Sequence, residues 1–340
     1  MELVSTPGNP VPGEPAVMQV ATQDGVILRV ARWGSASQES ARGTVCILQG
    51  RAEFIEKYFE TIADLRRRGF AVAAFDWRGQ GGSGRQVGDP RKGHVSTFDA
   101  YRRDLEAVWD QVLEPLMPKP YFGLAHSMGG AIALMGAREG WLPFERFVAT
   151  APMIALSLVQ RTGLARNSAA LLAALGFGQS FIPGGGGTSV LLRPFSGNLL
   201  TSDPQRYARN AEAAAAMGAG AIGDPTIGWV HAAFKVMGAF AEPRYPLEIH
   251  VPTLVVAAGL DGVCATPAIE RFAARMKAGR AIVIPGSRHE ILMERNAIRE
   301  EFWAAFDAFV PGAGPDPAVS GRVQQGESRL MQPAVADGEN

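Results

Sequence analysis

The sequence predicts an α/β fold in which a mostly parallel central sheet has helices on both faces and carries a helical cap insertion. Three observations predict this class. Short apolar runs recur along the chain, segments with helical spacing separate most of them, and the alternation stops once for about a hundred residues. The 340-residue chain is 47% hydrophobic, so it can bury a large core.

The strands are predicted from the apolar runs, because strands that are buried on both faces read this way. Asp24-Gly25 is a tight-turn signal between 18–21 and 26–33, which predicts an opening hairpin. The remaining runs are 45–48, 71–75, 121–125, 147–149, 254–257 and 281–284.

Helices are predicted where apolar residues recur with helical spacing. The first covers 55–65 and would end at Gly69, and the second covers 98–112 after Ser96 or Thr97. A third covers 298–309. Because strands and helices alternate, we expect a parallel sheet that is covered on both faces.

The alternation stops between the runs at 147–149 and 254–257. An insertion of this length in a compact domain is usually functional, often as a lid. We therefore predict a mostly helical cap over 154–241, inserted into a core of 17–153 and 242–310. The ends are rich in Pro, Gly, Ser, Gln and Ala, which predicts a flexible segment over 1–16 and a disordered tail over 311–340.

Composition excludes several classes of protein. The 33 basic residues balance 33 acidic residues without a basic stripe, which argues against a nucleic-acid partner. Cys46 and Cys264 are too few for a disulfide scaffold and indicate reduced thiols in the cytoplasm. The start of the chain lacks a signal-peptide pattern, and Gly and Pro interrupt the uncharged stretch 167–192, so we expect no membrane span.

The candidate nucleophile follows the run 121–125. Ala125-His126-Ser127-Met128-Gly129 is close to G-x-S-x-G, the sharp strand-to-helix turn that lifts a serine hydroxyl above a sheet. Ala125 replaces the first glycine, and alanine adds only one methyl group. The alternative is a serine in an ordinary glycine-rich turn.

A serine hydroxyl needs a base, and the base needs a carboxylate to orient it. His289 follows the last predicted strand and Asp261 follows the preceding one, in the chain order Ser, acid, His. The alternatives are a helix-capping aspartate and a solvated loop histidine. Asp76 also ends a strand, but Arg78 and the glycines after it favour a structural anchor.

The other histidines are expected to have structural roles. His126 is adjacent to Ser127, and neighbouring side chains on a sharp turn point apart. The histidines that lack a nucleophile or carboxylate in a matching loop are His94, His231 and His250.

Ester hydrolysis also requires donors for the oxyanion. One is expected to be the backbone N–H of Met128, after the nucleophile. The other is expected from the loop after 45–48, where the N–H of Arg51 is the best candidate and Gly50 allows close approach.

Six motifs within 19–310 carry a family resemblance. They are Gln49-Gly50-Arg51-Ala52-Glu53, Asp76-Trp77-Arg78-Gly79-Gln80-Gly81-Gly82-Ser83-Gly84-Arg85, His126-Ser127-Met128-Gly129-Gly130, Leu200-Thr201-Ser202-Asp203, Gly259-Leu260-Asp261 and His289-Glu290. The chain resembles the α/β-hydrolase family, and within it the monoacylglycerol lipase and lysophospholipase group. Many lipases of the group carry His-Gly before the oxyanion residue, whereas Gln49-Gly50 is more similar to bacterial lysophospholipases.

The resemblance implies the α/β-hydrolase fold and a serine hydrolase without metal or cofactor. Ser127 would be the nucleophile, Asp261 the acid, His289 the base, and Arg51 and Met128 the oxyanion donors. We expect an acyl-enzyme intermediate and a lipid-like ester substrate, either a lysophospholipid or a monoacylglycerol. The alternatives are an acyltransferase, a small-ester carboxylesterase and a ligand-binding protein without turnover. We expect a cytoplasmic protein that contacts membrane surfaces transiently through its cap.

Two sets of residues leave their roles open. Apolar residues of the cap, among them Leu171, Leu175 and Phe177, could line an acyl tunnel or form the cap's own core. Four arginines could meet a phosphate head group or lie solvated at the surface. They are Arg51, Arg161, Arg166 and Arg193.

Overall fold

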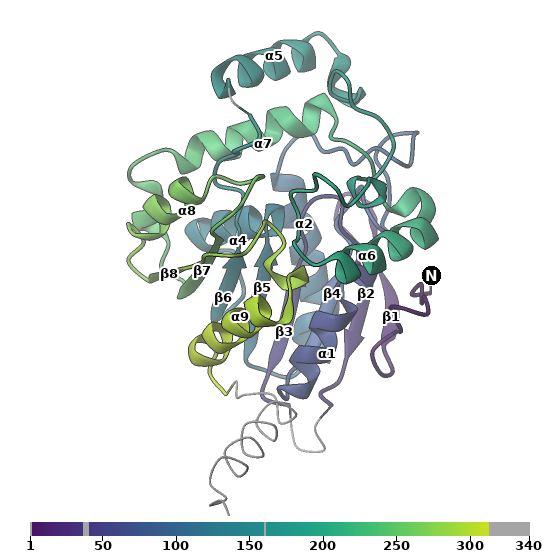
Figure 1. The fold of residues 1–340 in the computed structure, drawn as a ribbon, viewed down its shortest axis with the longest axis vertical. Coiled ribbons are helices and arrows are strands. Elements are labelled where there is room, and N and C mark those ends of the chain that lie inside the picture. The colour runs from purple at the N-terminus through teal and green to yellow at the C-terminus, as the bar shows by residue number, and fades with distance from the viewer. Residues whose placement is uncertain (1, 37–40, 160, 313–340) are drawn as a thin grey trace, which may run out of the picture.

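The computed structural model describes residues 2–36, 41–159 and 161–312, and an eight-stranded sheet forms its centre (Figure 1). The strands are β1 Ala16–Ala21, β2 Ile27–Trp33, β3 Thr44–Leu48, β4 Ala71–Phe75, β5 Tyr121–His126, β6 Arg146–Thr150, β7 Thr253–Ala258 and β8 Gly279–Ile284. Their spatial order is β1-β2-β4-β3-β5-β6-β7-β8. The pairs β1/β2 and β2/β4 are antiparallel, and the pairs from β4 to β8 are parallel.

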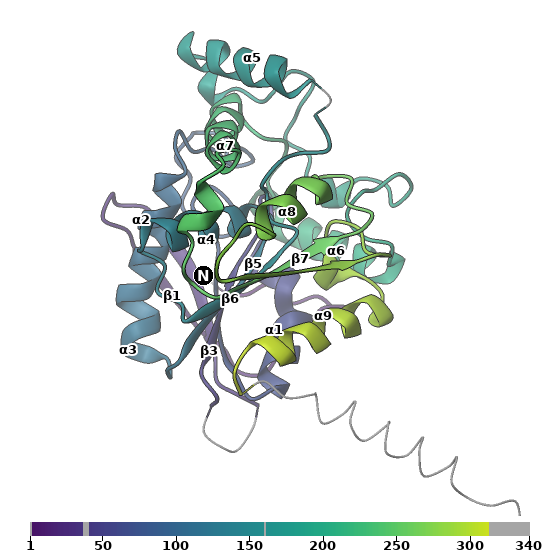
Figure 2. The ribbon, with the colours of Figure 1, turned by 90° about the vertical axis from the view of Figure 1, so that its left-hand side faces the viewer.

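Helices cover both faces of the sheet. Their bounds are α1 Phe59–Arg67, α2 Asp99–Val108, α3 Glu114–Leu116, α4 Met128–Glu139, α5 Thr162–Ala174, α6 Pro204–Met217, α7 Ile227–Phe240, α8 Thr266–Ala273 and α9 Asn296–Phe309. Apolar residues of α1 and α9 pack into one core cluster, and those of α2, α4 and α8 pack into the cluster on the other face. Figure 2 shows α2 and α3 on one side of the sheet and α1 and α9 on the other.

The predicted fold class is confirmed, because each predicted apolar run matches a strand, with Val26 of the run 26–33 lying one residue before β2. The opening hairpin is also confirmed: Gly25 donates its N–H to Thr22 O at 2.9 Å and has a φ of +80°, which suits glycine. One helix differs from the prediction over 98–112. It ends as α2 at Val108, continues as a π-helical turn over Trp109–Leu113, and finishes as α3.

Residues 2–15 contact the core, although their composition predicts a flexible segment. Val4 N donates to Glu56 Oε1 at 3.0 Å, and Asn9 Nδ2 donates to Glu56 O at 2.8 Å. Asn9 is buried. At the other end, the predicted tail over 311–340 lies outside the described residues from residue 313 on.

The interval between β6 and β7 holds α5, α6 and α7. All three helices fall within the predicted cap, whose bounds of 154–241 stay a prediction. Figures 1 and 2 show α7 over one end of the sheet and α5 outermost. Leu164 and Leu171 on α5 and Leu175 just after it are each at least 60% exposed, so they form neither a buried tunnel nor a core.

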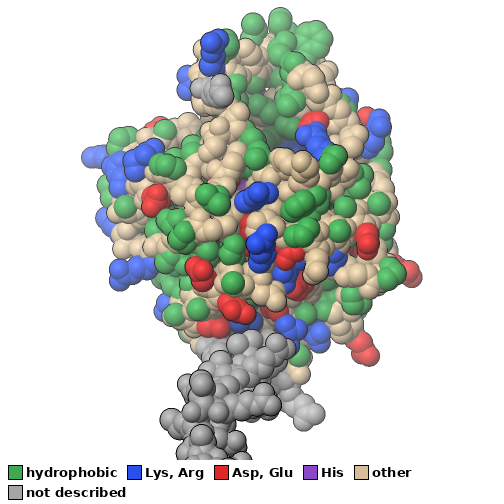
Figure 3. Space-filling model, in the orientation of Figure 1, with side chains coloured by type: hydrophobic (Ala, Val, Ile, Leu, Met, Phe, Trp, Pro, Cys, Tyr) green, Lys and Arg blue, Asp and Glu red, His purple; other side chains and the backbone are tan. Residues whose placement is uncertain are grey.

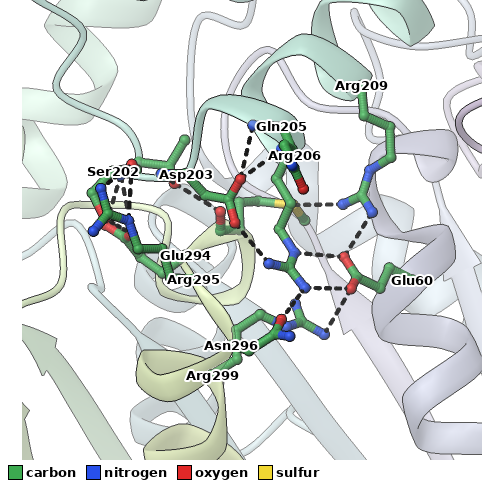
Figure 4. Close-up of polar contacts among 12 residues, drawn as sticks. Glu60, Ser202, Asp203, Gln205, Arg206, Arg209, Glu294, Arg295, Asn296 and Arg299 are labelled. Carbon is green, nitrogen blue, oxygen red and sulfur yellow. Dashed lines mark hydrogen bonds and ion pairs between the residues drawn. The ribbon is translucent and has the colours of Figure 1, made fainter.

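The α6 helix is joined to the core by ion pairs (Figure 4). Asp203 caps its N-terminus by accepting from Gln205 N and Arg206 N. Arg206 Nη2 lies 2.6 Å and Arg209 Nη1 lies 2.7 Å from the carboxylate of Glu60 on α1. Three cations therefore meet one carboxylate, since Arg299 of α9 lies 3.8 Å from the same group.

Within 2–36, 41–159 and 161–312, no helix combines the length and apolar character that crossing a membrane requires.

We predict that Glu60→Gln destabilises the protein by about 2 kcal/mol, because partly buried arginines lose their shared counter-charge. Burial raises the pKa of Glu60, but the hydrogen bond from Arg206 and the charges of Arg299 and Arg209 outweigh it and lower the pKa from 4.5 to about 2. The native state therefore gains stability from this group above pH 4.5 and loses that gain as the pH falls toward 2.

Urea unfolding between pH 7 and pH 3 measures both effects. The difference between wild type and Glu60→Gln should narrow as the solution is acidified. Glu106→Gln is the control, because it breaks an exposed ion pair with Arg102 and should cost no more than about 0.5 kcal/mol. Equal losses in the two variants would contradict the prediction.

Candidate active site

Ser127 occupies a strained turn between a strand and a helix. It stands alone between the end of β5 and the start of α4, with φ 49° and ψ −110°. Gly129 is required by close approach, because a Cβ on it would lie 2.1 Å from Leu48 O. The turn therefore brings the first residues of α4 against the end of β3, and its strain is of the kind found at functional sites.

The structure brings together the three residues predicted from separate loops. The Ser127 Oγ lies 3.0 Å from His289 Nε2. His289 Nδ1 lies 2.9 Å and 3.1 Å from the two carboxylate oxygens of Asp261. This is the geometry in which a carboxylate orients an imidazole toward a hydroxyl.

The loops that carry the acid and the base are joined to each other. Asp261 Oδ1 accepts from Val263 N and Cys264 N, both at 2.8 Å, which directs its carboxylate. Leu260 N donates to Ser287 O at 2.8 Å. A Cβ on Gly259 would lie 2.4 Å from Pro285 O, so glycine allows the two loops to lie close together.

His126 packs against the candidate base, as expected of a structural neighbour. Its ring centroid lies 4.9 Å from that of His289, and its Nδ1 lies 3.1 Å from Thr150 Oγ1. Burial lowers the pKa of His126 to about 4, so the ring is neutral at physiological pH. A neutral ring supports His289 without repelling it when it gains a proton.

Asp76 is the structural anchor that its surroundings predicted. Its carboxylate is buried, pairs with Arg29 at 2.6 Å, and accepts from Ile55 N at 2.9 Å and Gly82 N at 2.7 Å. These contacts leave it in a different hydrogen-bond network from His289.

The loop after β3 presents the amide of Arg51. Gly50 N donates to Glu53 Oε2, and Gln80 Nε2 donates to Gly50 O and Glu53 O at 2.9 Å each. Among the described residues, neither the Arg51 amide nor the Met128 amide donates to a protein acceptor. Both are therefore available to a ligand.

A buried ion network that sequence reasoning missed joins this loop to the histidine loop. Lys57 Nζ lies 2.5 Å from Glu53 Oε1 and 2.6 Å from Glu290 Oε1, and the lysine side chain is 1% exposed. Tyr58 OH donates to Glu53 Oε2 at 2.6 Å. In the sequence, the feature that could have indicated this network is a lysine, Lys57, within a strongly apolar helical segment. The sequence alone does not show which carboxylates pair with it.

The charges of this network follow from burial and pairing. Burial lowers the pKa of Lys57, but the two carboxylates outweigh it and raise the pKa above its ordinary value. Burial also raises the pKa of Glu53, yet Lys57 and His126 bring it below its ordinary value. The pKa of Glu290 stays raised, by burial first and then by the charge of Glu53.

One group of side chains in the described residues is close enough to share a metal ion. The ligand atoms of Asp261, Cys264 and His289 lie within 4.8 Å of one another. Asp261 and His289 hydrogen-bond to each other, and His289 also hydrogen-bonds to Ser127, so we interpret the group as part of the hydroxyl-activating site. Cys264 is a free, buried thiol whose pKa is raised well above its ordinary value by burial.

Known proteins resemble this chain over most of its length. The model of the serine aminopeptidase S33 family matches residues 39–296. Lysophospholipase L2 of Escherichia coli strain K12 is 34% identical over 267 residues, which span 75% of this chain and 76% of the relative. A probable lysophospholipase L2 of Haemophilus influenzae is 26% identical over 273 residues, 80% of this chain and 85% of the relative.

Solved structures share the fold at lower identity. A soluble variant of monoglyceride lipase from Saccharomyces cerevisiae has a TM-score of 0.68 at 20% identity, covering 86% of this chain and 94% of its own. A thermostable carboxyl esterase from Bacillus coagulans has a TM-score of 0.69 at 19% identity, and the match covers 88% of this chain and 98% of the esterase chain. Both show an α/β-hydrolase fold for this chain.

We predict that Lys57→Met destabilises the protein by about 3–5 kcal/mol, because it leaves two buried carboxylates facing each other without a counter-charge. Adding Glu290→Gln should recover part of the loss, since one of the two charges is then removed. Urea unfolding at pH 7 measures these changes.

The control is Lys277→Met at an exposed position, which should stay within about 0.5 kcal/mol of wild type. If Lys57→Met lowers the free energy of unfolding by less than about 1 kcal/mol, the two buried carboxylates do not depend on the lysine charge and the prediction is wrong.

Proposed function

The chain belongs to the serine aminopeptidase S33 family of α/β-hydrolases, and from that premise we propose that it cleaves carboxylic esters of lipid-like substrates through a Ser-His-Asp triad. The observation that carries the proposal is the continuous chain of contacts from Asp261 through His289 to Ser127, with 2.9 Å and 3.0 Å between the bonded atoms. A triad of this geometry converts a weakly nucleophilic hydroxyl into an effective one.

The reaction proceeds through two acyl transfers. His289 Nε2 takes the Ser127 proton as Oγ attacks the ester carbonyl, and the Arg51 and Met128 amides stabilise the oxyanion. His289 then protonates the departing alcohol, which leaves an acyl group on Ser127. Water, deprotonated by His289, attacks this acyl-enzyme, and the fatty acid leaves as Ser127 regains its proton.

The substrate is proposed to be a lysophospholipid or a monoacylglycerol. Support comes from the name lysophospholipase L2 of the Escherichia coli relative, of which the chain covers 76%. Acyl transfer to an acceptor other than water would use the same residues, and short esters would react by the same chemistry. Both activities are therefore to be assayed beside lipid ester hydrolysis.

The cap is proposed to contact lipid surfaces transiently. Leu164 and Leu171 on α5 and Leu175 just after it are exposed, and Figure 3 shows hydrophobic side chains at the top of the molecule, where α5 lies. An exposed apolar patch of this kind marks a surface that interacts with a partner or a membrane. Two buried free thiols support a reducing, cytoplasmic location.

We predict that Ser127→Ala lowers ester hydrolysis by at least about a thousandfold with the fold unchanged, because no other group supplies the attacking oxygen. A panel of short aryl esters, monoacylglycerols and lysophospholipids measures the rates, and thermal unfolding checks the fold. Ser168→Ala, at an exposed position on α5, is the matched control and should keep wild-type rates.

A fluorophosphonate probe gives an independent readout. It should label wild type at Ser127 and leave Ser127→Ala unlabelled. Labelling at another residue, or equal hydrolysis by both proteins, would overturn the proposed function.

A further inference from the structure

The guanidinium of Arg51 forms no ion pair with a carboxylate in the described part of the chain, and the carboxylate whose charge acts on it, Asp224, is paired with Arg193. In the described part of the chain, its side chain makes one hydrogen bond, from Nη2 to Gly223 O at 2.9 Å, and no ion pair with a carboxylate. Its carbon Cζ lies 5.1 Å from the ring centre of Trp229, and its buried Nε has no partner. A buried N–H without an acceptor is costly and calls for a ligand.

The position of this guanidinium is set by the core on one side and the cap on the other. Its backbone follows β3, which pairs in parallel with the strand that leads to Ser127. Its side chain reaches Gly223 and Trp229 of the cap, and Trp229 is held by a 3.1 Å hydrogen bond to Tyr101 OH. The charge therefore lies between the oxyanion loop and the cap that faces it.

The arginines of the cap differ from Arg51. Arg193 is paired with Asp224 at 2.9 Å, and that carboxylate also accepts from Gly186 N. Arg161 and Arg166 are exposed to solvent. Burial lowers the pKa of Arg51 to about 10, so it is still a cation at neutral pH.

We propose that the Arg51 side chain binds the phosphate of the substrate head group, so that the enzyme selects lysophospholipids over monoacylglycerols. A guanidinium presents several N–H donors in a plane, which matches phosphate oxygens, and such charge-assisted bonds are strong. The same residue offers its amide to the ester oxyanion. Phosphate and ester must therefore lie only a few bonds apart, as they do on one glycerol unit.

This inference rests on the proposed function, and kinetics with matched lipids test it. Monoacylglycerol and lysophosphatidylcholine with the same short acyl chain are compared below their micelle concentrations. In Arg51→Gln, the ratio of kcat/KM for the phospholipid to kcat/KM for the neutral lipid should fall by about tenfold or more. In Arg51→Lys this ratio should lie between those of wild type and Arg51→Gln, because lysine keeps the positive charge but lacks the planar N–H donors.

Arg166→Gln is the matched control, since it removes the same charge from an exposed cap position and should keep the ratio. Thermal unfolding checks that each variant folds. An unchanged ratio in Arg51→Gln, or an equal fall in Arg166→Gln, overturns the inference and leaves the proposed function intact.

A second experiment separates a phosphate site from lipid hydrolysis. Glycerol 3-phosphate and inorganic phosphate are tested as inhibitors of short aryl ester hydrolysis, and the inhibition constants should rise by about tenfold in Arg51→Gln. Stronger inhibition by glycerol 3-phosphate assigns the site to a head group, and equal inhibition assigns it to free phosphate and overturns the head-group role. Hydrolysis of aryl esters with no lipid ester cleaved would instead defeat the proposed function.

Discussion

The parallel hydrogen bonding of β3, β5, β6, β7 and β8 is the constraint on which the rest of the structure depends. It places the carboxyl ends of five strands at one edge, so loops that are far apart in sequence meet there. The turn at Ser127 and the loops that carry Asp261 and His289 follow three of these strands. The close contacts that Gly129 and Gly259 allow then reduce the remaining distance to hydrogen-bond length.

A second layer of contacts orders these loops from beneath. The Lys57 ammonium lies between Glu53, in the loop that presents the Arg51 amide, and Glu290, next to His289. Each carboxylate is buried, so neither can exchange its partner for water, and the lysine links the two loops into one unit. His126 fills the space beside the base as a neutral ring. Ser127, His289 and the loop of Arg51 are therefore positioned by groups outside the proposed triad.

The cap is attached unevenly. The α6 helix is held through arginines that meet Glu60, and the preceding segment is held because Ser202 N and Oγ donate to Glu294, near the base loop. The α5 helix packs mainly on α7 and exposes leucines. Ion pairs and hydrogen bonds thus hold the α6 side of the cap to the core, whereas the α5 side exposes an apolar surface. Between them, Arg51 meets the cap without a carboxylate of its own.

The sequence by itself determined the strand runs, the hairpin at Asp24-Gly25, and the order Ser127, Asp261, His289, because periodicity and turn chemistry are local properties of the chain. It also distinguished Asp261 from Asp76 by the residues around each. Only the tertiary structure decided which charges meet. Lys57 and Glu290 are 233 residues apart, and no local pattern records their 2.6 Å contact. The same holds for Arg51, because its lack of an ion pair among the described residues depends on all the groups that surround it. Long-range electrostatics in a buried site depends on the packed fold, whereas strands and turns depend on neighbours in sequence.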